Sequence, residues 1–218
     1  MMTCDILLLG VGGQGVVTLG DLLARAALAA DVPMSFVPTK GMAQRGGFVK
    51  AEVRLGHRTA GPRIATGGAD LVLSMERSET LKGLPFLSRN SRTVLYDHVW
   101  EPTGVQLGDD AYPSRDDVVA SVADRCDEIV LLDPAKRPEF GGAPVVANIY
   151  ALGALAGADR LRKLIDSRVL EQTVVDRWPK AAEANLAAFQ AGFIQGNKPI
   201  GRFLGDARTL PSAKESDE

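Results

Sequence analysis

Short apolar runs alternate with longer amphipathic stretches through the first two thirds of the chain. The short runs are typical of strands buried in a parallel sheet, and they occupy residues 5–9, 34–39, 69–75, 93–98 and 128–134. The amphipathic stretches have the apolar spacing of helices, and they occupy residues 14–30, 77–88 and 116–126. This alternation predicts an α/β fold with a doubly wound, Rossmann-like and mainly parallel sheet, which opens with a βαβ unit.

Two segments depart from this alternation. Residues 48–56, "FVKAEVRLG", alternate between apolar and polar from Val49 to Leu55, which predicts a half-exposed strand that adds to the sheet in the antiparallel direction. From Pro144 onward the pattern predicts helices only, with Pro144 itself in a first helical turn. We therefore expect an α/β core domain over residues 1–143, C-terminal helices packed on it over 144–205, and a disordered tail over 206–218.

The stretch "GVGGQGVVTLG", residues 10–20, joins the first strand to the first helix and matches the G-x-G-x-x-G pattern. In such a turn, Gly10 lets the strand turn sharply, Gly12 allows a ligand close to the backbone, and Gly15 allows the helix to pack on the sheet. The free N–H groups and the positive dipole end of the new helix favour an anion. Gly12, Gly13, Gln14 and Gly15 are therefore candidates to bind a phosphate, a pyrophosphate or a carboxylate.

A dinucleotide site needs more than this turn. NAD binding usually requires an acidic residue at the end of the second strand, about 20 residues on, to bond the ribose hydroxyls. Here that strand ends "FVPTK", and Asp31 precedes the strand instead. The missing acid disfavours NAD, although Lys40 leaves NADP open and a turn that serves only packing remains an alternative.

A second glycine-rich loop, "KGMAQRGG" at residues 40–47, follows the second strand. Loops at the carboxyl ends of strands form the ligand crevice of open α/β sheets, so we expect the two loops to be neighbours. Arg45 could pair there with an anion or a partner subunit, or remain an ordinary solvated arginine.

Composition adds mainly exclusions. A net charge of −2 does not indicate a protein that binds nucleic acid. The two cysteines, Cys4 and Cys126, are too few to bind a four-cysteine iron–sulfur cluster. The low cysteine count and the lack of a basic leader or a membrane-length apolar run lead us to expect a cytoplasmic protein that is not bound to a membrane. His57 and His98 are expected to be surface or strand-end histidines, and Asp97 a strand-end cap. No motif for a nucleophile or a metal is present.

Four stretches nevertheless resemble a known family: "ILLLGVGGQGVVTLGDLLARAAL", "TKGMAQRGGFVKAEVRLG", "NIYALGALAG" and "RWPKAAEANLAAFQAGF". They look like the gamma-type subunit of 2-oxoacid:ferredoxin oxidoreductases, and within that family like the beta subunit of the indolepyruvate enzymes. The resemblance runs from Asp5 to Phe193. It implies an enzyme complex that decarboxylates a 2-oxoacid, such as an arylpyruvate, with thiamine diphosphate. The electrons pass through iron–sulfur clusters to ferredoxin, and the product is an acyl-coenzyme A.

The resemblance also implies how the work is divided. Thiamine diphosphate, Mg²⁺ and the clusters are expected on a larger partner subunit, which also contacts ferredoxin, and none of them on this chain alone. This chain would be a non-redox member of a hetero-oligomer, inactive alone, that shapes the site where coenzyme A approaches.

At residue level the resemblance gives two sets of candidates. Gly12, Gly13, Gln14 and Gly15 are expected to meet a phosphate of coenzyme A, and Lys40, Met42, Gln44, Arg45 and Gly46 to face the substrate or the partner. The segment "SMERSET" at 74–80 departs from the family pattern, with Glu76 as its matching acid. The alternatives are a self-sufficient NAD(P)-dependent dehydrogenase and a non-enzymatic Rossmann-like binding module.

Overall fold

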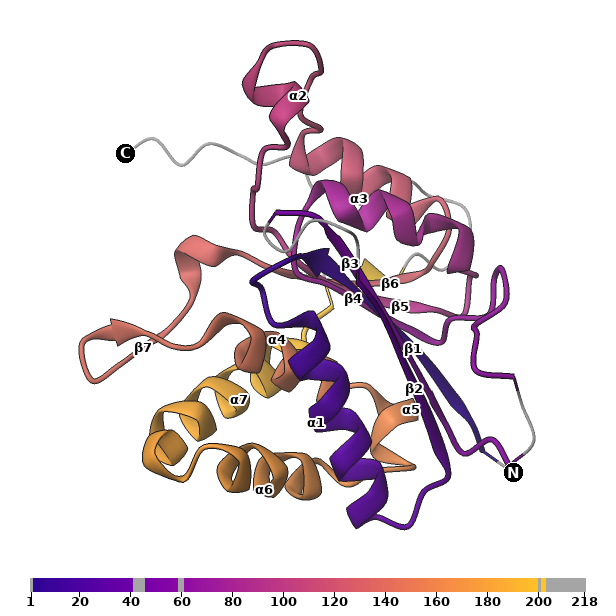
Figure 1. Cartoon of the computed structure of the whole chain (residues 1–218), viewed down its shortest axis with the longest axis vertical. Coiled ribbons are helices and arrows are strands. Elements are labelled where there is room, and N and C mark those ends of the chain that lie inside the picture. Colours follow the sequence, from indigo (N-terminus) through magenta and orange to yellow (C-terminus); the bar gives the residue numbers. More distant parts are fainter. Residues whose placement is uncertain (1, 41–45, 59–60, 200, 203–218) are drawn as a thin grey trace.

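The computed structural model describes residues 2–40, 46–58, 61–199 and 201–202, and it contains one sheet with helices on both faces (Figure 1). The strands of this sheet are β1 Cys4–Val11, β2 Met34–Lys40, β3 Phe48–Leu55, β4 Leu71–Ser74, β5 Arg92–Tyr96, β6 Glu128–Leu132 and β9 Gly201–Arg202. The α-helices are α1 Val16–Ala29, α2 Thr103–Gln106, α3 Arg115–Ala123, α4 Ala147–Ala156, α5 Asp159–Arg162, α6 Ser167–Arg177 and α7 Ala182–Gly196. Short 3₁₀ helices lie at η1 Ser78–Phe86, η2 Pro134–Lys136 and η3 Pro179–Ala181, and a separate hairpin consists of β7 Glu139–Phe140 and β8 Ala143–Pro144.

The strand order in the sheet is β2-β3-β1-β4-β5-β6-β9. Strands β1, β4, β5 and β6 are parallel neighbours, whereas β3 is antiparallel both to β1 and to β2. Strand β2 therefore runs in the same direction as β1, as the βαβ prediction requires, but β3 lies between them. The predicted antiparallel strand at 48–56 is confirmed, and its position splits the βαβ unit.

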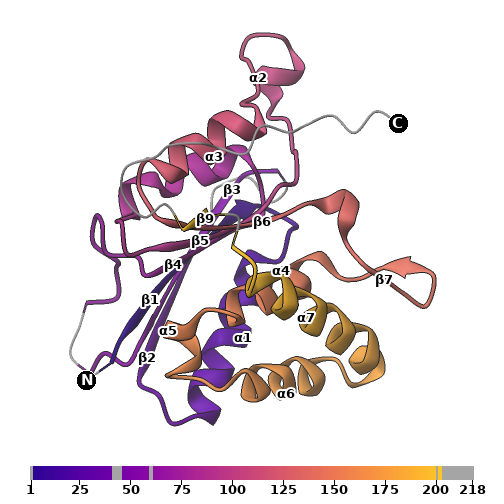
Figure 2. The same cartoon turned by 180° about the vertical axis from the view of Figure 1, so that it is seen from behind.

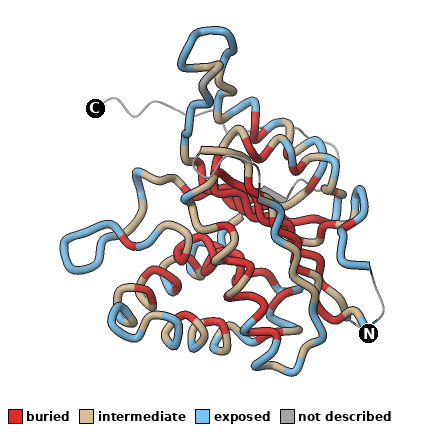
Figure 3. The backbone as a smooth tube through the Cα atoms, in the orientation of Figure 1, coloured by how far each residue is buried: buried red, intermediate tan, exposed pale blue. Residues whose placement is uncertain are grey.

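Strand β1 is at the centre of the fold, and all eight of its residues are buried. Its side chains alternate between the two faces, because successive residues of a strand point in opposite directions. Ile6 and Leu8 belong to the cluster formed with α1, α4, α6 and α7, while Leu7 and Leu9 belong to the cluster formed with α3 and η1. Figures 1 and 2 show these two groups of helices on opposite sides of the sheet, and Figure 3 shows the continuous buried band between them. The doubly wound fold is confirmed.

The C-terminal helices pack on the sheet, since α4, α6 and α7 contribute to the same core cluster as β1. The prediction that Pro144 lies in a first helical turn is wrong. Pro144 lies in strand β8, and helix α4 begins only at Ala147. The reason is the turn before it: Gly141 and Gly142 have φ values of 60° and 81°, which is the geometry of a tight hairpin turn. The predicted tail, residues 206–218, lies outside the described residues, within which no helix is long and apolar enough to cross a membrane.

Helices α4 and α7 touch at their backbones. A Cβ atom built on Gly192 would lie 1.8 Å from the carbonyl oxygen of Tyr150, and one on Gly153 would lie 2.0 Å from that of Phe189. Both distances are far below van der Waals contact, and neither neighbour is a flexible side chain. The glycines of "NIYALGALAG" and "NLAAFQAGF" therefore set how closely the helical layer packs on itself.

We predict that Gly192→Ala lowers the free energy of unfolding by about 2 kcal/mol or more, because overpacking against backbone typically costs about 1–3 kcal/mol. The loss should appear although alanine has the higher helix propensity by about 1 kcal/mol. Urea denaturation followed by circular dichroism measures the change. The control is Gln190→Ala at an exposed position of the same helix, which should leave stability within about 0.5 kcal/mol of wild type. A stable Gly192→Ala protein would contradict the close contact.

Candidate functional site

The first glycine-rich turn lies at the carboxyl edge of the sheet, between β1 and α1. Gly13 and Gly15 have φ values of 102° and 80°, a region that side chains other than glycine rarely adopt. Gly15 is also the N-cap of α1, and among the described residues no side chain caps this helix. The first turn of α1 therefore presents backbone N–H groups and a positive dipole end at this edge.

The two glycine-rich loops meet at this edge, as the sequence predicts. The N–H of Gly12 donates a hydrogen bond to the carbonyl of Gly47, at 2.8 Å. The contact follows from the pairing of Val11 with Phe48, because the carboxyl end of β1 lies beside the amino end of antiparallel β3. Lys40 ends β2 on the same side. The predicted site residues Met42, Gln44 and Arg45 lie outside the described residues.

Gly46 is described, and it contacts Trp100 rather than the first loop. It has a φ of 71°, and a Cβ atom there would lie 3.1 Å from Nε1 of Trp100. The indole is 45% exposed, so it forms part of the surface beside the second loop.

The side chain of Gln14 joins the ends of three strands. Its Oε1 accepts a hydrogen bond from the N–H of Val11 at 3.0 Å, and its Nε2 donates to the carbonyl of Met75 at 2.9 Å. The same Nε2 lies 3.3 Å from Nδ1 of His98. These contacts turn the amide inward, so Gln14 positions the turn, and the backbone N–H groups of the turn remain as candidate ligand donors.

Asn148 is a site residue that the spacing of residues in the sequence did not predict. It lies in the first turn of α4 and packs against the glycine turn, so that a Cβ atom on Gly15 would lie 2.2 Å from its Nδ2. The only signal in the sequence was its place at the start of "NIYALGALAG", one of the stretches that carry the family resemblance. Helix α4 thus supports the turn from the side of the C-terminal layer.

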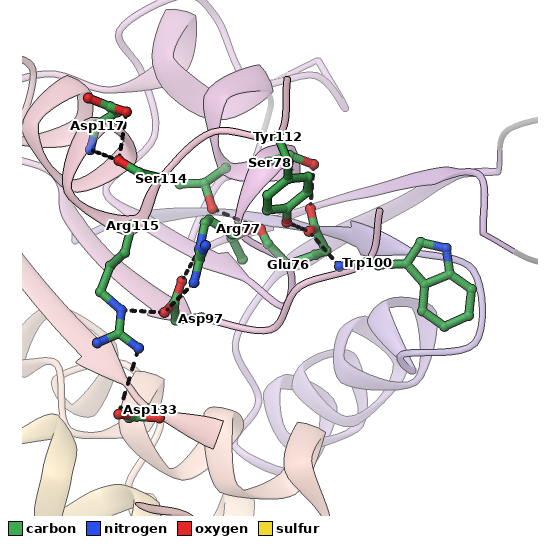
Figure 4. A network of polar contacts seen from close by, with 12 residues as sticks. Glu76, Arg77, Ser78, Asp97, Trp100, Tyr112, Ser114, Arg115, Asp117 and Asp133 are labelled. Atoms are coloured by element: carbon green, nitrogen blue, oxygen red, sulfur yellow. Dashed lines mark hydrogen bonds and ion pairs between the residues drawn. The ribbon is translucent and has the colours of Figure 1, made fainter. Parts of the chain in front are cut away.

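Glu76, the matching acid of "SMERSET", is fully buried directly after β4 (Figure 4). Its Oε2 accepts from the hydroxyl of Ser78 and the N–H of Glu79, each at 2.8 Å. Its Oε1 accepts from the N–H of Trp100 at 3.1 Å and from the hydroxyl of Tyr112. Burial, together with the bond to Glu76, raises the pKa of Tyr112 to about 12, so this hydroxyl remains a donor at neutral pH.

Asp97, expected to cap a strand end, is held by two arginines instead. Its carboxylate accepts Nε and Nη2 of Arg77 at 2.6 and 3.0 Å, and Nε of Arg115 at 2.5 Å. Hydrogen bonding to Asp97 raises the pKa of the Arg77 guanidinium further above its usual range. Figure 4 shows how Arg115 also reaches Asp133 after β6. Both buried carboxylates are saturated by partners within the chain, so this network holds the carboxyl edge in place.

The two histidines lie at opposite edges of the sheet. His98 is at the carboxyl edge, half-buried, with its ring stacked at 6.4 Å from that of Tyr96. His57 lies beside the start of β1, where its Nε2 is 2.8 Å from Oδ1 of Asp5 and close to Arg54. Within the described part of the chain, no cluster of His, Cys, Asp or Glu side chains could hold a metal.

A cavity of about 300 Å³ lies at the amino edge, on the far side from the glycine turn. Its charged walls pair with one another: Arg92 with Glu128 at 2.7 Å, and Arg160 with Asp70 at 3.1 Å. Ligands of open α/β sheets bind at the carboxyl edge, where the strand order leaves a crevice. The paired walls make this cavity part of the scaffold, and the carboxyl edge with its two loops is the candidate site.

The position of β3 argues against a dinucleotide at this edge. In a dinucleotide-binding fold the strand beside β1 is parallel to it and presents the ribose-binding acid at its carboxyl end. Here that neighbour is antiparallel β3, which presents its amino end, Phe48, instead. Together with the missing acid after β2, this disfavours the NAD(P) alternative.

Fold and site together define a Rossmann-like α/β protein whose candidate ligand edge lies at two glycine-rich loops, and the buried carboxylates described at this edge are bound by partners within the chain. Residues 5–195 match the family model described as pyruvate ferredoxin/flavodoxin oxidoreductase, and the chain belongs to this family. It is a gamma-type, IorB-like subunit of the 2-oxoacid:ferredoxin oxidoreductases.

Named relatives agree with this assignment over nearly the full chain. The indolepyruvate oxidoreductase subunit IorB of Archaeoglobus fulgidus is 31% identical over 196 residues, which cover 89% of this chain and 96% of that protein. The corresponding subunit of Thermococcus kodakarensis is 30% identical, covering 92% of this chain and 100% of that protein. The 2-oxoglutarate synthase subunit KorC of Methanocaldococcus jannaschii is 29% identical over 88% of this chain and 93% of that protein.

Solved structures share the fold. The gamma subunit of a keto/oxoacid ferredoxin oxidoreductase from Geobacter sulfurreducens superposes with a TM-score of 0.59 at 22% identity, covering 88% of this chain and 98% of that one. The 2-oxoglutarate:ferredoxin oxidoreductase from Magnetococcus marinus, with 2-oxoglutarate, coenzyme A and succinyl-CoA bound, superposes with a TM-score of 0.66 at 18% identity. That match covers 90% of this chain and 31% of the longer one.

The contact between Asn148 and Gly15 can be tested with a double-mutant cycle. Gly15→Ala should lower the free energy of unfolding by about 1–3 kcal/mol, because it adds left-handed strain to a collision with the amide. In an Asn148→Ala background the same substitution should cost about 1 kcal/mol less, because the collision is gone.

Urea denaturation of the four proteins measures this coupling. Gly13→Ala is the control for backbone strain alone, since no heavy atom of the described residues lies within 4 Å of a Cβ at Gly13. An equal cost of Gly15→Ala in both backgrounds would show that Asn148 does not touch the turn.

Proposed function

We propose that this chain is the non-redox subunit of a complex that converts an arylpyruvate, such as indolepyruvate, to its acyl-coenzyme A with reduction of ferredoxin. The observation that carries the proposal is the hydrogen bond between Gly12 and Gly47, which joins the two glycine-rich loops into one surface. In this proposal the combined surface is where coenzyme A approaches and where the larger subunit docks.

Electrostatics at the glycine turn favour a phosphate of coenzyme A. No side chain in the described part of the chain caps the N-terminus of α1, and the glycines at 12, 13 and 15 allow an anion to reach its N–H groups. Lys40 and Arg45 in the second loop would add positive charge, with Met42, Gln44 and Gly46 facing the substrate or the partner. The enzyme from Magnetococcus marinus, which shares this fold, was solved with coenzyme A bound.

We place thiamine diphosphate, Mg²⁺ and the iron–sulfur clusters on the larger partner subunit. The family comprises subunits of multi-subunit oxidoreductases that use these groups. A four-cysteine cluster needs four thiolates, and this chain has two cysteines. Cys4 and Cys126 are both buried in the core, and burial raises the pKa of each thiol, which keeps it in its protonated form.

The arylpyruvate preference rests on the indolepyruvate subunits among the relatives. We predict that the complex purified with its thiamine-binding partner reduces ferredoxin in the presence of indolepyruvate and coenzyme A. Its kcat/KM for indolepyruvate should exceed that for 2-oxoglutarate by at least about tenfold, as an apolar pocket discriminates by about 10–200-fold. The chain alone should show no activity. A complex that prefers 2-oxoglutarate would overturn the substrate, while the subunit role would stand.

The second loop has its own test. In the assembled complex, Arg45→Ala should raise the KM for coenzyme A by about tenfold, because a hydrogen bond to a charged group contributes about 1.5–3 kcal/mol. The KM for the 2-oxoacid should stay within about twofold. Arg168→Ala, an exposed arginine on α6, is the matched control and should change neither constant. Unchanged KM values for Arg45→Ala would show that this arginine is an ordinary surface charge.

A further inference from the structure

The segment that joins β5 to α3 projects from the body of the molecule, above the carboxyl edge (Figures 1 and 2). We call residues 99–111 the spur. It contains helix α2 and closes on itself, since the N–H of Asp109 donates to the carbonyl of Gly104 at 2.9 Å and Nε2 of Gln106 donates to the carbonyl of Glu101 at 2.9 Å. The spur is therefore a folded surface loop with its own internal hydrogen bonds.

Both ends of the spur are held by one buried oxygen. Oε1 of Glu76 accepts from the N–H of Trp100 at the start of the spur and from the hydroxyl of Tyr112 just after its end (Figure 4). Arg77 adds a second contact, with its guanidinium 5.8 Å from the centre of the Tyr112 ring. Burying a carboxylate is costly unless hydrogen bonds offset the lost hydration, and here those bonds fix the base of the spur. The spur is thus presented in a defined position.

Its surface has the composition of a binding patch. Leu107 is 72% exposed, and Trp100 and Val99 at the start of the spur are 45% and 42% exposed. The charged residues of the spur are all acidic, Glu101, Asp109 and Asp110, and all three are exposed. Exposed aromatic and aliphatic residues accompanied by charged ones, here the three acidic residues that we call the rim, are a composition found at protein interfaces.

We propose that the spur docks into an apolar groove rimmed by lysine or arginine on the larger partner subunit. The proposal rests on the proposed function, which supplies that partner. The indole of Trp100 lies against Gly46, so the spur continues the surface of the second glycine-rich loop. A second copy of this chain fits less well, because a two-fold contact would bring the acidic rims of the two spurs together.

The test uses the complex assembled from the full chain and its thiamine-binding partner. Leu107→Asp should raise the Kd of assembly at least about tenfold, since central apolar contacts dominate interfaces. Leu28→Asp is the matched control: Leu28 is 78% exposed at the far end of α1, and its variant should assemble within about twofold of wild type. Equal thermal stability of the two isolated variants would show that the fold is intact.

Charge reversal tests the rim. The double variant Asp109→Lys/Asp110→Lys should weaken assembly at low salt and reduce its salt dependence, because an attractive pairing has been removed. Assembly of Leu107→Asp with wild-type affinity would overturn the proposal. So would an isolated wild-type chain that is a dimer and becomes a monomer with Leu107→Asp, because the occupant would then be a second copy. If the complex forms through the spur but shows no coenzyme A-dependent oxidation of a 2-oxoacid, the docking surface stands and the proposed function fails.

Discussion

The antiparallel pairing of β3 with β1 is the constraint on which the carboxyl edge depends. It places Phe48 beside Val11, and the Gly12–Gly47 hydrogen bond continues the ladder beyond the last strand residues. If β2 paired directly with β1, the loop after β2 would still lie at this edge. However, no strand starting from that loop would then run back beside β1. Here the return of the chain as β3 joins both glycine-rich loops by a backbone bond. The surface proposed for coenzyme A and the partner is thus specified by strand pairing.

Around the carboxyl edge, buried carboxylates stabilise the structure through hydrogen bonds and ion pairs. Glu76 and Asp97 follow β4 and β5, where an α/β enzyme of another class would place its catalytic acids, yet both are saturated by donors from the same chain. These hydrogen bonds and ion pairs instead hold the base of the spur and the start of α3 in place. This agrees with the proposed role of a subunit whose chemistry lies on a partner chain, because a fixed scaffold presents a surface without needing a reactive group.

The sequence alone predicted the α/β architecture and the proximity of the two glycine-rich loops. The period of two at 48–56 predicted an antiparallel strand, but periodicity carries no information on which strands it pairs with, so the split βαβ unit had to come from the structure. Pro144 was misassigned because a proline fits both a first helical turn and a strand end, and the left-handed turn at Gly141 and Gly142 decided between them. The contact of Asn148 with Gly15 and the bonds of Glu76 to Trp100 and Tyr112 could not be predicted for a similar reason, since each joins residues far apart in the chain.

The orientation of the Gln14 amide has a consequence for His98. Two backbone groups, the N–H of Val11 and the carbonyl of Met75, determine which end of that amide is oxygen and which is nitrogen. The amide nitrogen therefore faces Nδ1 of His98 as a donor, and Nδ1 has to accept. The neutral imidazole consequently carries its hydrogen on Nε2. The glycine turn thereby selects one tautomer of a histidine that is 84 residues away in the sequence.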